Sequence, residues 1–252
     1  MYKAVILDLD GTTIPNKKDG RPSPRVIEII KKIKNQVFVS AATGRGIGLA
    51  GHIIKELGLT APCIVNGGTR IIDPITEKIL WEKSMDKAQI EKVMEIAEEY
   101  QYNVFIGDDT EGSLAKYKIT KKDERIIYIE PVTEEDTKII LQKLSSIPDI
   151  SAHKIISWTL GHFDIHITHS EATKRHSMEV LLELLGVHKD EVVAVGDSNN
   201  DLPLFELAGY KVAMANGSEE LKAKADLIAP SVDEDGLAYV LEKLFLEGKL
   251  SK

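Results

Sequence analysis

The sequence predicts an α/β protein in which a doubly wound parallel sheet carries a smaller, inserted α+β domain. In the first and last thirds of the 252 residues, short apolar runs alternate with amphipathic helical stretches. Continuous apolar strands between helices are typical of a parallel sheet that helices cover on both faces. The middle third lacks this alternation. In such a core we expect ligands to bind at the carboxyl ends of the strands.

The first expected elements of the core are a strand at 4–7 and a helix at 24–34, where Val26, Ile29 and Ile33 recur at helical spacing. The later elements follow the same rhythm. They are strands at 37–39, 62–65, 192–195 and 211–214, and helices at 47–57, 177–185, 202–207 and 236–246. We therefore assign residues 1–81 and 168–252 to the core domain.

The segment 82–167 has a different pattern, in which strands cluster and two helices separate them. Strands are expected at 103–106, 114–118, 125–129 and 163–167, and helices at 88–100 and 134–145. This α+β pattern indicates a second domain inserted into the core. The polar stretch 107–112 predicts a loop or hairpin, and we interpret its acidic pair, Asp108 and Asp109, as a solvated turn rather than a metal site.

The bulk composition is that of a soluble globular protein, with 43% apolar and 29% charged residues. No apolar run approaches the roughly 18 residues that span a bilayer, and the N-terminal run is too short for a signal peptide. The single cysteine, Cys63, excludes an internal disulfide framework, and its apolar surroundings in the sequence predict a buried, inert thiol. These features predict a cytoplasmic protein.

The net charge of −8 argues against non-specific binding to nucleic acid or to an anionic membrane. A phosphorylated substrate would therefore need a local positive site, built from a metal ion and a few basic residues. The sequence carries no signal for an oligomeric state.

Two carboxylates end the first strand. Asp8 and Asp10 stand two residues apart, so a strand places them on the same side. A turn at Asp10-Gly11 explains Asp10 as an ordinary strand exit. It does not explain Asp8, which lies within the apolar pattern, where an unpaired carboxylate is costly. A nearby cation or a chemical role for Asp8 would remove this cost.

Two further segments have features that suit an anion. Thr43 and Gly44 begin a glycine-rich turn after the second strand, where backbone N–H groups and a hydroxyl can face an anion, although an ordinary helix cap also explains them. Lys174 opens a helix, where a positive charge opposes the helix dipole. Either a solvated lysine or an anion held beside the helix end accounts for that placement.

The strand at 192–195 ends in Gly196-Asp197, and Asp201 follows four residues later. If this strand neighbours the first one, Asp197 converges with Asp8 and Asp10. Hard oxygen ligands in this number suit Mg²⁺ better than zinc, which favours nitrogen and sulfur.

These four segments, in this order, resemble the motifs of the haloacid-dehalogenase-like (HAD) superfamily of phosphohydrolases. Asp8-Leu-Asp-Gly-Thr is similar to its first motif and Thr43-Gly-Arg to its second. Lys174 matches the third-motif lysine, and Gly196-Asp-Ser-Asn-Asn-Asp the fourth motif. The stretch 208–222, together with Asp233-Glu-Asp-Gly-Leu and Asn66-Gly-Gly, resembles the Cof-like sugar-phosphatase branch. The resemblance covers essentially the whole chain and implies a Rossmann-like core.

The resemblance implies a Mg²⁺-dependent phosphatase that hydrolyses small phosphorylated metabolites, such as sugar phosphates, through an aspartyl-phosphate. Asp8 is then the nucleophile and Asp10 the general acid/base. The residues implied for phosphate binding are Thr43, Gly44, Lys174 and Asn200. The implied Mg²⁺ ligands are Asp8, the Asp10 backbone carbonyl, Asp197 and, directly or through water, Asp201.

By the same resemblance, 82–167 is a cap domain of the C2B type, which covers the active site and selects the leaving group. The chain departs from the family pattern at Arg175, where glycine is usual, and at Thr13, where an apolar residue is usual. A phosphotransferase or mutase working through the same intermediate is an alternative. A non-catalytic phosphometabolite-binding protein is a further one, but it predicts loss of Asp8 or Asp10, and both are present.

Overall fold

The computed structural model describes residues 2–106, 126–157 and 159–248. Its core is a five-stranded parallel sheet in the order β12-β11-β10-β1-β2. The strands are β1 (Ala4–Leu7), β2 (Phe38–Ala41), β10 (Val192–Gly196), β11 (Tyr210–Met214) and β12 (Leu227–Ala229). Val5 of β1 lies opposite Val39 of β2 and Val193 of β10, so β1 is an interior strand whose two neighbours are far apart in sequence. The predicted parallel sheet is confirmed.

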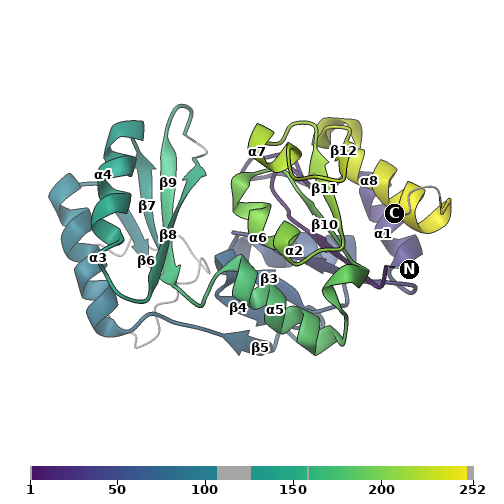
Figure 1. The fold of residues 1–252 in the computed structure, drawn as a ribbon, viewed down its shortest axis with the longest axis horizontal. Coiled ribbons are helices and arrows are strands. Elements are labelled where there is room, and N and C mark those ends of the chain that lie inside the picture. Colours follow the sequence, from purple (N-terminus) through teal and green to yellow (C-terminus); the bar gives the residue numbers. More distant parts are fainter. Residues whose placement is uncertain (1, 107–125, 158, 249–252) are drawn as a thin grey trace.

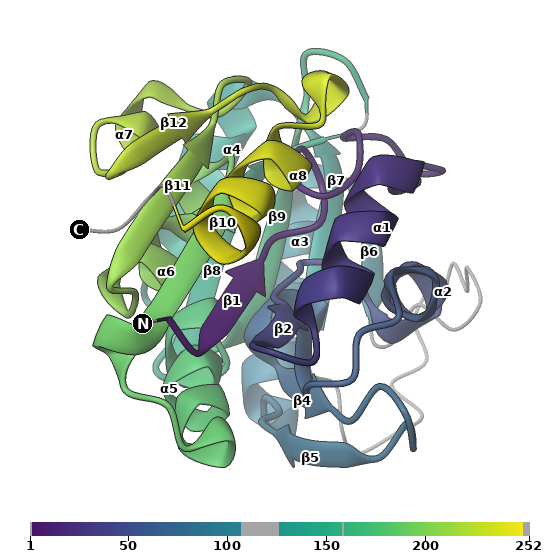
Figure 2. The same ribbon diagram turned by 90° about the vertical axis from the view of Figure 1, so that its right-hand side faces the viewer.

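Helices cover both faces of this sheet (Figure 2). Val5 and Leu7 of β1 pack with helices on one face, and Ala4 and Ile6 pack with helices on the other. The first group comprises α1 (Pro24–Ile33), α2 (Ile47–Leu57) and α8 (Gly236–Leu241). The second comprises α5 (Lys174–Leu185), α6 (Leu202–Glu206) and α7 (Glu219–Lys222). Because successive residues of a strand point to opposite faces, an apolar β1 requires cover on both faces.

The local sequence explains where the first helix begins and which face it buries. The hydroxyl of Ser23 accepts a hydrogen bond from the backbone N–H of Val26 at 3.2 Å, and Pro24 occupies the first helical position. The apolar stripe predicted from the sequence is buried: Val26, Ile29, Ile30 and Ile33. The helical turn Glu242–Leu246 continues α8, as the predicted helix at 236–246 requires.

Beside the core lies a small antiparallel sheet in the order β3-β4-β5. It contains β3 (Cys63–Val65), β4 (Arg70–Ile72) and β5 (Ile79–Glu82). A bridge between Ala42 and Ile64 joins it to the end of β2. The sequence predicted β3 as a strand of the parallel sheet and missed β4 and β5. They are three and four residues long, too short for a period of two to stand out.

The inserted segment forms a separate four-stranded antiparallel sheet in the order β6-β7-β9-β8 (Figure 1). Its strands are β6 (Asn103–Ile106), β7 (Ile126–Val132), β8 (Ile150–Ile156) and β9 (Phe163–His169). Two helices, α3 (Lys87–Tyr100) and α4 (Glu134–Leu144), pack on the face of the sheet that is turned away from the core. This is the predicted α+β arrangement, whereas the boundaries 82–167 stay a prediction.

β8 was missed because His153 and Lys154 interrupt its apolar pattern. The predicted strand at 114–118 and the loop at 107–112, with Asp108 and Asp109, lie outside the described residues. No helix in the described ranges is long and apolar enough to cross a membrane. Cys63 is buried, and burial raises the pKa of its thiol to about 12.

Candidate active site

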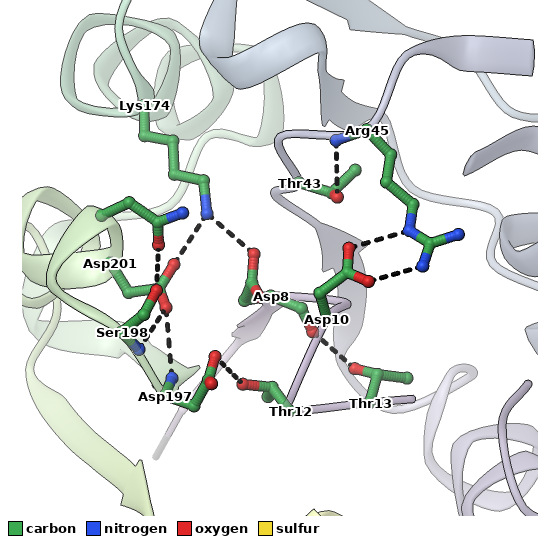
Figure 3. A network of polar contacts seen from close by, with 11 residues as sticks. Asp8, Asp10, Thr12, Thr13, Thr43, Arg45, Lys174, Asp197, Ser198 and Asp201 are labelled. Atoms are coloured by element: carbon green, nitrogen blue, oxygen red, sulfur yellow. Dashed lines mark hydrogen bonds and ion pairs between the residues drawn. The ribbon is translucent and has the colours of Figure 1, made fainter. Parts of the chain in front are cut away.

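The carboxyl ends of three neighbouring strands bring the predicted residues together (Figure 3). Asp8 follows β1, Thr43 follows β2, and Asp197 follows β10, with β1 paired to both of the others. Lys174 is the first residue of α5, which packs beside this edge. The expected convergence at the strand ends is therefore present, since parallel neighbours end at the same edge of a sheet.

Lys174 lies between two carboxylates. Its Nζ atom is 2.7 Å from Oδ1 of Asp8 and 2.7 Å from Oδ1 of Asp201. The exposed fractions are 4% for Asp8, 5% for Lys174 and 0% for Asp201. Burial by itself lowers the pKa of Lys174, but the charges of Asp201 and Asp8 outweigh it, so the net shift of this pKa is upward and the ammonium keeps its charge. Lys174 is therefore not a solvated lysine, since its partners are two buried carboxylates of the protein; an anion held beside it and the helix end stays a prediction.

Asp201 also holds the loop that carries Asp197. Its Oδ2 atom accepts hydrogen bonds from the backbone N–H groups of Asp197 and Ser198, both at 3.1 Å. Because its Oδ1 faces Lys174, both oxygens of Asp201 have partners within the protein. This arrangement orients Asp197 relative to Asp8.

Asp8, Asp197 and Asp201 form the one group of three or more acidic, His or Cys side chains in the described part of the chain that could hold a metal ion. One ligand atom from each lies within 4.8 Å of the others. Burial, then the charge of Asp201, raises the pKa of Asp197 to about 7. Burial, followed by Asp201, also raises the pKa of Asp8 well above its ordinary value despite Lys174. One lysine does not balance this much negative charge, so the site suits a further cation.

The chemistry of the donors indicates which cation fits. All three side chains offer carboxylate oxygens, which are the ligands that Mg²⁺ prefers. We therefore find that the residues present fit Mg²⁺.

Asp10 is oriented differently from the other acids. Its carboxylate accepts two hydrogen bonds from Arg45, 2.8 Å from Nε to Oδ2 and 2.5 Å from Nη2 to Oδ1 (Figure 3). The next residue, Gly11, has a φ of 76°, and a Cβ there would lie 2.2 Å from Oδ2 of Asp197. Only glycine combines this backbone conformation with this close approach. The turn therefore keeps the chain of Asp10 beside Asp197 while its carboxylate faces Arg45.

Thr43 is fully buried, and its hydroxyl accepts a hydrogen bond from the backbone N–H of Arg45 at 3.0 Å. It does not cap the following helix, because the N-cap of α2 is Gly46 and has no side-chain cap bond. Asn200 accepts a hydrogen bond at Oδ1 from the hydroxyl of Ser198 at 2.6 Å.

Gly44 is one place where the inserted sheet approaches the core. The hydroxyl of Tyr128 on β7 donates to its carbonyl oxygen at 3.4 Å. The Cε1 atom of His166 on β9 lies 3.6 Å from the position that a Cβ on Gly44 would take. Burial lowers the pKa of His166 to about 3, so this imidazole is neutral. A neutral aromatic pair thus lies over the turn that follows Thr43.

The two departures from the family pattern differ in their contacts. Thr13 is buried, and its hydroxyl donates to the backbone carbonyl of Asp8 at 2.6 Å. Arg175 is half-exposed and lies near Glu179, at 3.8 Å, and Glu206, at 3.5 Å. Arg175 therefore pairs with acids on α5 and α6, and Thr13 supports the backbone of the nucleophile candidate.

Sequence reasoning missed several residues that build this site. Arg45 was quoted as part of Thr43-Gly-Arg but given no role, and that motif is the signal that could have found it. Asn216 donates from Nδ2 to the carbonyl oxygen of Gly11 at 2.8 Å, and the Asn-Gly-Ser turn around it was the available signal. Tyr128 and His166 have no local signal, because only the position of the inserted sheet brings them to Gly44.

The fold and this cluster define a Rossmann-like enzyme core with an acidic, lysine-bridged site under an inserted cap. The sequence matches the haloacid dehalogenase-like hydrolases at residues 5–125 and 109–241. The chain belongs to this family. The expectation that it is a hydrolase of the HAD superfamily is therefore confirmed.

Relatives and solved structures agree with this assignment. A phosphoglycolate phosphatase from Methanosarcina acetivorans is 27% identical, covering 98% of this chain and 97% of its own. A 5-amino-6-(5-phospho-D-ribitylamino)uracil phosphatase from Bacillus subtilis is 26% identical, covering 96% and 98%. A haloacid dehalogenase-like hydrolase from Bacteroides thetaiotaomicron is 25% identical with a TM-score of 0.79, covering 97% and 100%. A HAD subclass IIB sugar phosphatase shares the fold, with 20% identity and a TM-score of 0.79 over 98% and 100%.

Proposed function

We propose that this chain is a Mg²⁺-dependent phosphatase that hydrolyses small phosphorylated metabolites, sugar phosphates or similar, through an aspartyl-phosphate. The observation that carries the proposal is the buried arrangement of Asp8, Lys174 and Asp197 at one sheet edge. A nucleophile, a cation that faces it and a place for a metal ion are the parts that phosphoryl transfer requires. Relatives named phosphatases along nearly the full length of the chain support the same reaction.

Asp8, Asp197 and the Asp10 backbone carbonyl are the proposed Mg²⁺ ligands. Asp201 supports them, since both of its oxygens already accept hydrogen bonds. When bound, the ion offsets the repulsion between the carboxylate of Asp8 and an anionic phosphate.

In the first step, a carboxylate oxygen of Asp8 forms a bond to phosphorus and the bond from phosphorus to the ester oxygen breaks. Lys174 holds its ammonium 2.7 Å from Asp8, where it also faces the equatorial oxygens of the transferring group. Thr43, Gly44 and Asn200 complete the proposed phosphate site. The hydroxyl of Thr13 fixes the backbone of Asp8 from behind.

Asp10 moves the protons of both steps. As the ester bond breaks, the carboxyl of Asp10 gives its proton to the leaving alcohol oxygen. In the second step, a water attacks phosphorus, Asp10 accepts the proton of that water, and the bond from phosphorus to Asp8 breaks. Inorganic phosphate and the free carboxylate of Asp8 result.

The inserted sheet is proposed to select the leaving group. Its Tyr128 donates a hydrogen bond to Gly44 of the phosphate turn and His166 lies beside Gly44, so this face is the part of the insert proposed to meet the leaving group. The relatives act, by their names, on leaving groups as different as glycolate and a ribitylamino-uracil. The substrate screen should therefore span both kinds.

The test measures phosphate release by the purified chain from sugar phosphates, a polyol phosphate and phosphoglycolate, with Mg²⁺ and with a chelator. Asp8→Asn should abolish release from every substrate, because the amide is a poor nucleophile. Asp190→Asn is the matched control, since Asp190 is exposed in the turn that precedes β10, at the opposite end of that strand. Undiminished turnover by Asp8→Asn, or turnover insensitive to the chelator, would contradict the proposal. Transfer of the phosphoryl group to a second sugar without free phosphate would favour the phosphotransferase alternative.

A further inference from the structure

The buried side chain of Arg45 lies beside the proposed reaction centre and donates hydrogen bonds from all three guanidinium nitrogens. Its side chain is 3% exposed. Besides the two bonds to the carboxylate of Asp10, the guanidinium donates to the backbone carbonyl of Lys17 at 2.7 Å and to that of Lys18 at 3.0 Å. A planar guanidinium that donates two hydrogen bonds to one carboxylate fixes the orientation of that carboxylate and also offsets its charge. Arg45 therefore determines where the carboxylate of Asp10 points.

The backbone of Arg45 ties the same residue to the proposed phosphate site. Its N–H donates to the hydroxyl of Thr43 at 3.0 Å, and its carbonyl accepts from the N–H of Asn66 at 2.9 Å. One residue thus connects three parts of the site: the turn after β2, the segment 17–18 and the carboxylate of Asp10. A displacement of Arg45 would move Asp10 relative to any phosphate held at Thr43.

The bonds to Arg45 leave Asp10 able to transfer a proton. Each carboxylate oxygen has two lone-pair positions, and Arg45 occupies one position on each oxygen. The remaining positions are available to carry a proton to the leaving oxygen or to take one from water. A fixed donor is what general acid catalysis needs, because a proton moves efficiently only at hydrogen-bond distance.

We propose that Arg45 is the positioning residue for both proton transfers, holding Asp10 by its guanidinium fork so that the carboxyl is aimed at the leaving oxygen and then at the attacking water. The inference rests on the proposed phosphatase function. It assigns Arg45 no contact with the reacting atoms. A change at Arg45 should slow only the steps in which Asp10 transfers a proton, whereas the loss of a merely structural residue would slow every step.

The test compares two substrates that differ in their need for an acid. An alkyl phosphate loses an alkoxide that must be protonated, whereas p-nitrophenyl phosphate loses a stable phenolate without help. The variant is Arg45→Lys, which keeps the charge and loses the fork. Arg25→Lys is the control, since Arg25 is an exposed arginine that pairs with Glu242 on the surface.

We expect Arg45→Lys to lower kcat/KM for the alkyl phosphate by about 100-fold, the size of a general-acid contribution, and to leave kcat/KM for p-nitrophenyl phosphate nearly unchanged. With p-nitrophenyl phosphate the second proton transfer becomes slow, so a burst of phenolate should precede the steady state and the phosphorylated form of Asp8 should accumulate. In an Asp10→Asn background, Arg45→Lys should add little further loss, because both changes remove the same function.

Equal losses for the two substrates, or no loss for either, would overturn the inference. If Arg45→Lys unfolds, Arg45→Ala assayed with added guanidinium ion replaces it, and recovery of alkyl phosphate turnover is the expected result. Failure of the proposed phosphatase function would give a distinguishable result, since the wild-type chain would then release no phosphate or Asp8→Asn would remain active.

Discussion

Replacing Lys174 by methionine should destabilise the protein strongly as well as inactivate it. The side chain keeps its length, but Asp8 and Asp201 lose the ammonium that lies 2.7 Å from each. At that distance each attraction has a gross value of about 6 kcal/mol with an effective dielectric constant of about 20. Desolvation of the buried groups offsets most of this gain in the native protein.

The net loss is set by what is left behind. Removing one partner of a buried ion pair costs about 3–5 kcal/mol, because the remaining charge stays buried without compensation. Here two carboxylates, 4% and 0% exposed, share the one lysine. We therefore expect the free energy of unfolding to fall by about 3–5 kcal/mol, a large part of the 5–15 kcal/mol typical of a folded domain.

Urea unfolding followed by circular dichroism measures this free energy. Lys138→Met is the control, because Lys138 is exposed and its ion pair with Glu134 is 3.7 Å long, so its transition should not move. Added Mg²⁺ should recover part of the stability of Lys174→Met, since an ion bound only by the native state raises its stability by mass action. A Lys174→Met variant as stable as the wild-type chain would refute the reasoning, because Asp8 and Asp201 would then not depend on the ammonium.

Two further predictions concern packing and thiol chemistry. Gly68→Ala should destabilise the protein by more than the roughly 1–2 kcal/mol that an unfavourable backbone conformation costs. The φ of Gly68 is 107°, and the new Cβ would lie 2.3 Å from the carbonyl carbon of Thr173. Gly51→Ala in α2, where the nearest atom to the new Cβ is 4.0 Å away, should show no such loss in the same thermal unfolding assay. Cys63 should resist alkylation at pH 8 in the native protein and react fully in urea, because burial raises the pKa of its thiol to about 12, above that pH, whereas the unfolded thiol ionises near a pH of about 8.5. Rapid alkylation of the native protein would contradict that burial.

Agreement between sequence and structure is closest where a single local pattern specifies an element. The helix at 24–34 is an example, because Ser23, Pro24 and an apolar stripe at helical spacing all lie within one short stretch. Of the core strands, β1 and β10 were equally clear, since each is an uninterrupted apolar run, whereas β12, with three residues, was not predicted. The strands β4, β5 and β8 were missed because charged residues interrupt or end their apolar patterns: Arg70 in β4, Glu82 in β5 and Lys154 in β8.

The candidate site shows the same division. The sequence indicated Asp8, Lys174 and Asp197, because each breaks a local rule: a carboxylate in an apolar strand, a lysine at a helix start and an acid after a buried strand. Their distances depend on β1 and β10 being neighbours, although more than 180 residues separate them in the chain. Arg45 breaks no local rule, and its importance is visible only from the carboxylate that it holds.

By itself, the sequence determined that this chain forms a parallel α/β core with an inserted cap, that it belongs among the HAD hydrolases, and which residue types stand at the strand ends. Those features depend on interactions between residues close in sequence and on ordered motifs. Only the tertiary structure decided that Lys174 is shared by Asp8 and Asp201, that Asp10 is held by Arg45, and that Tyr128 and His166 lie over Gly44. The physical reason is that the partners of a buried charge and the contacts of the cap depend on which distant segments pack together, and a local sequence pattern does not specify that packing.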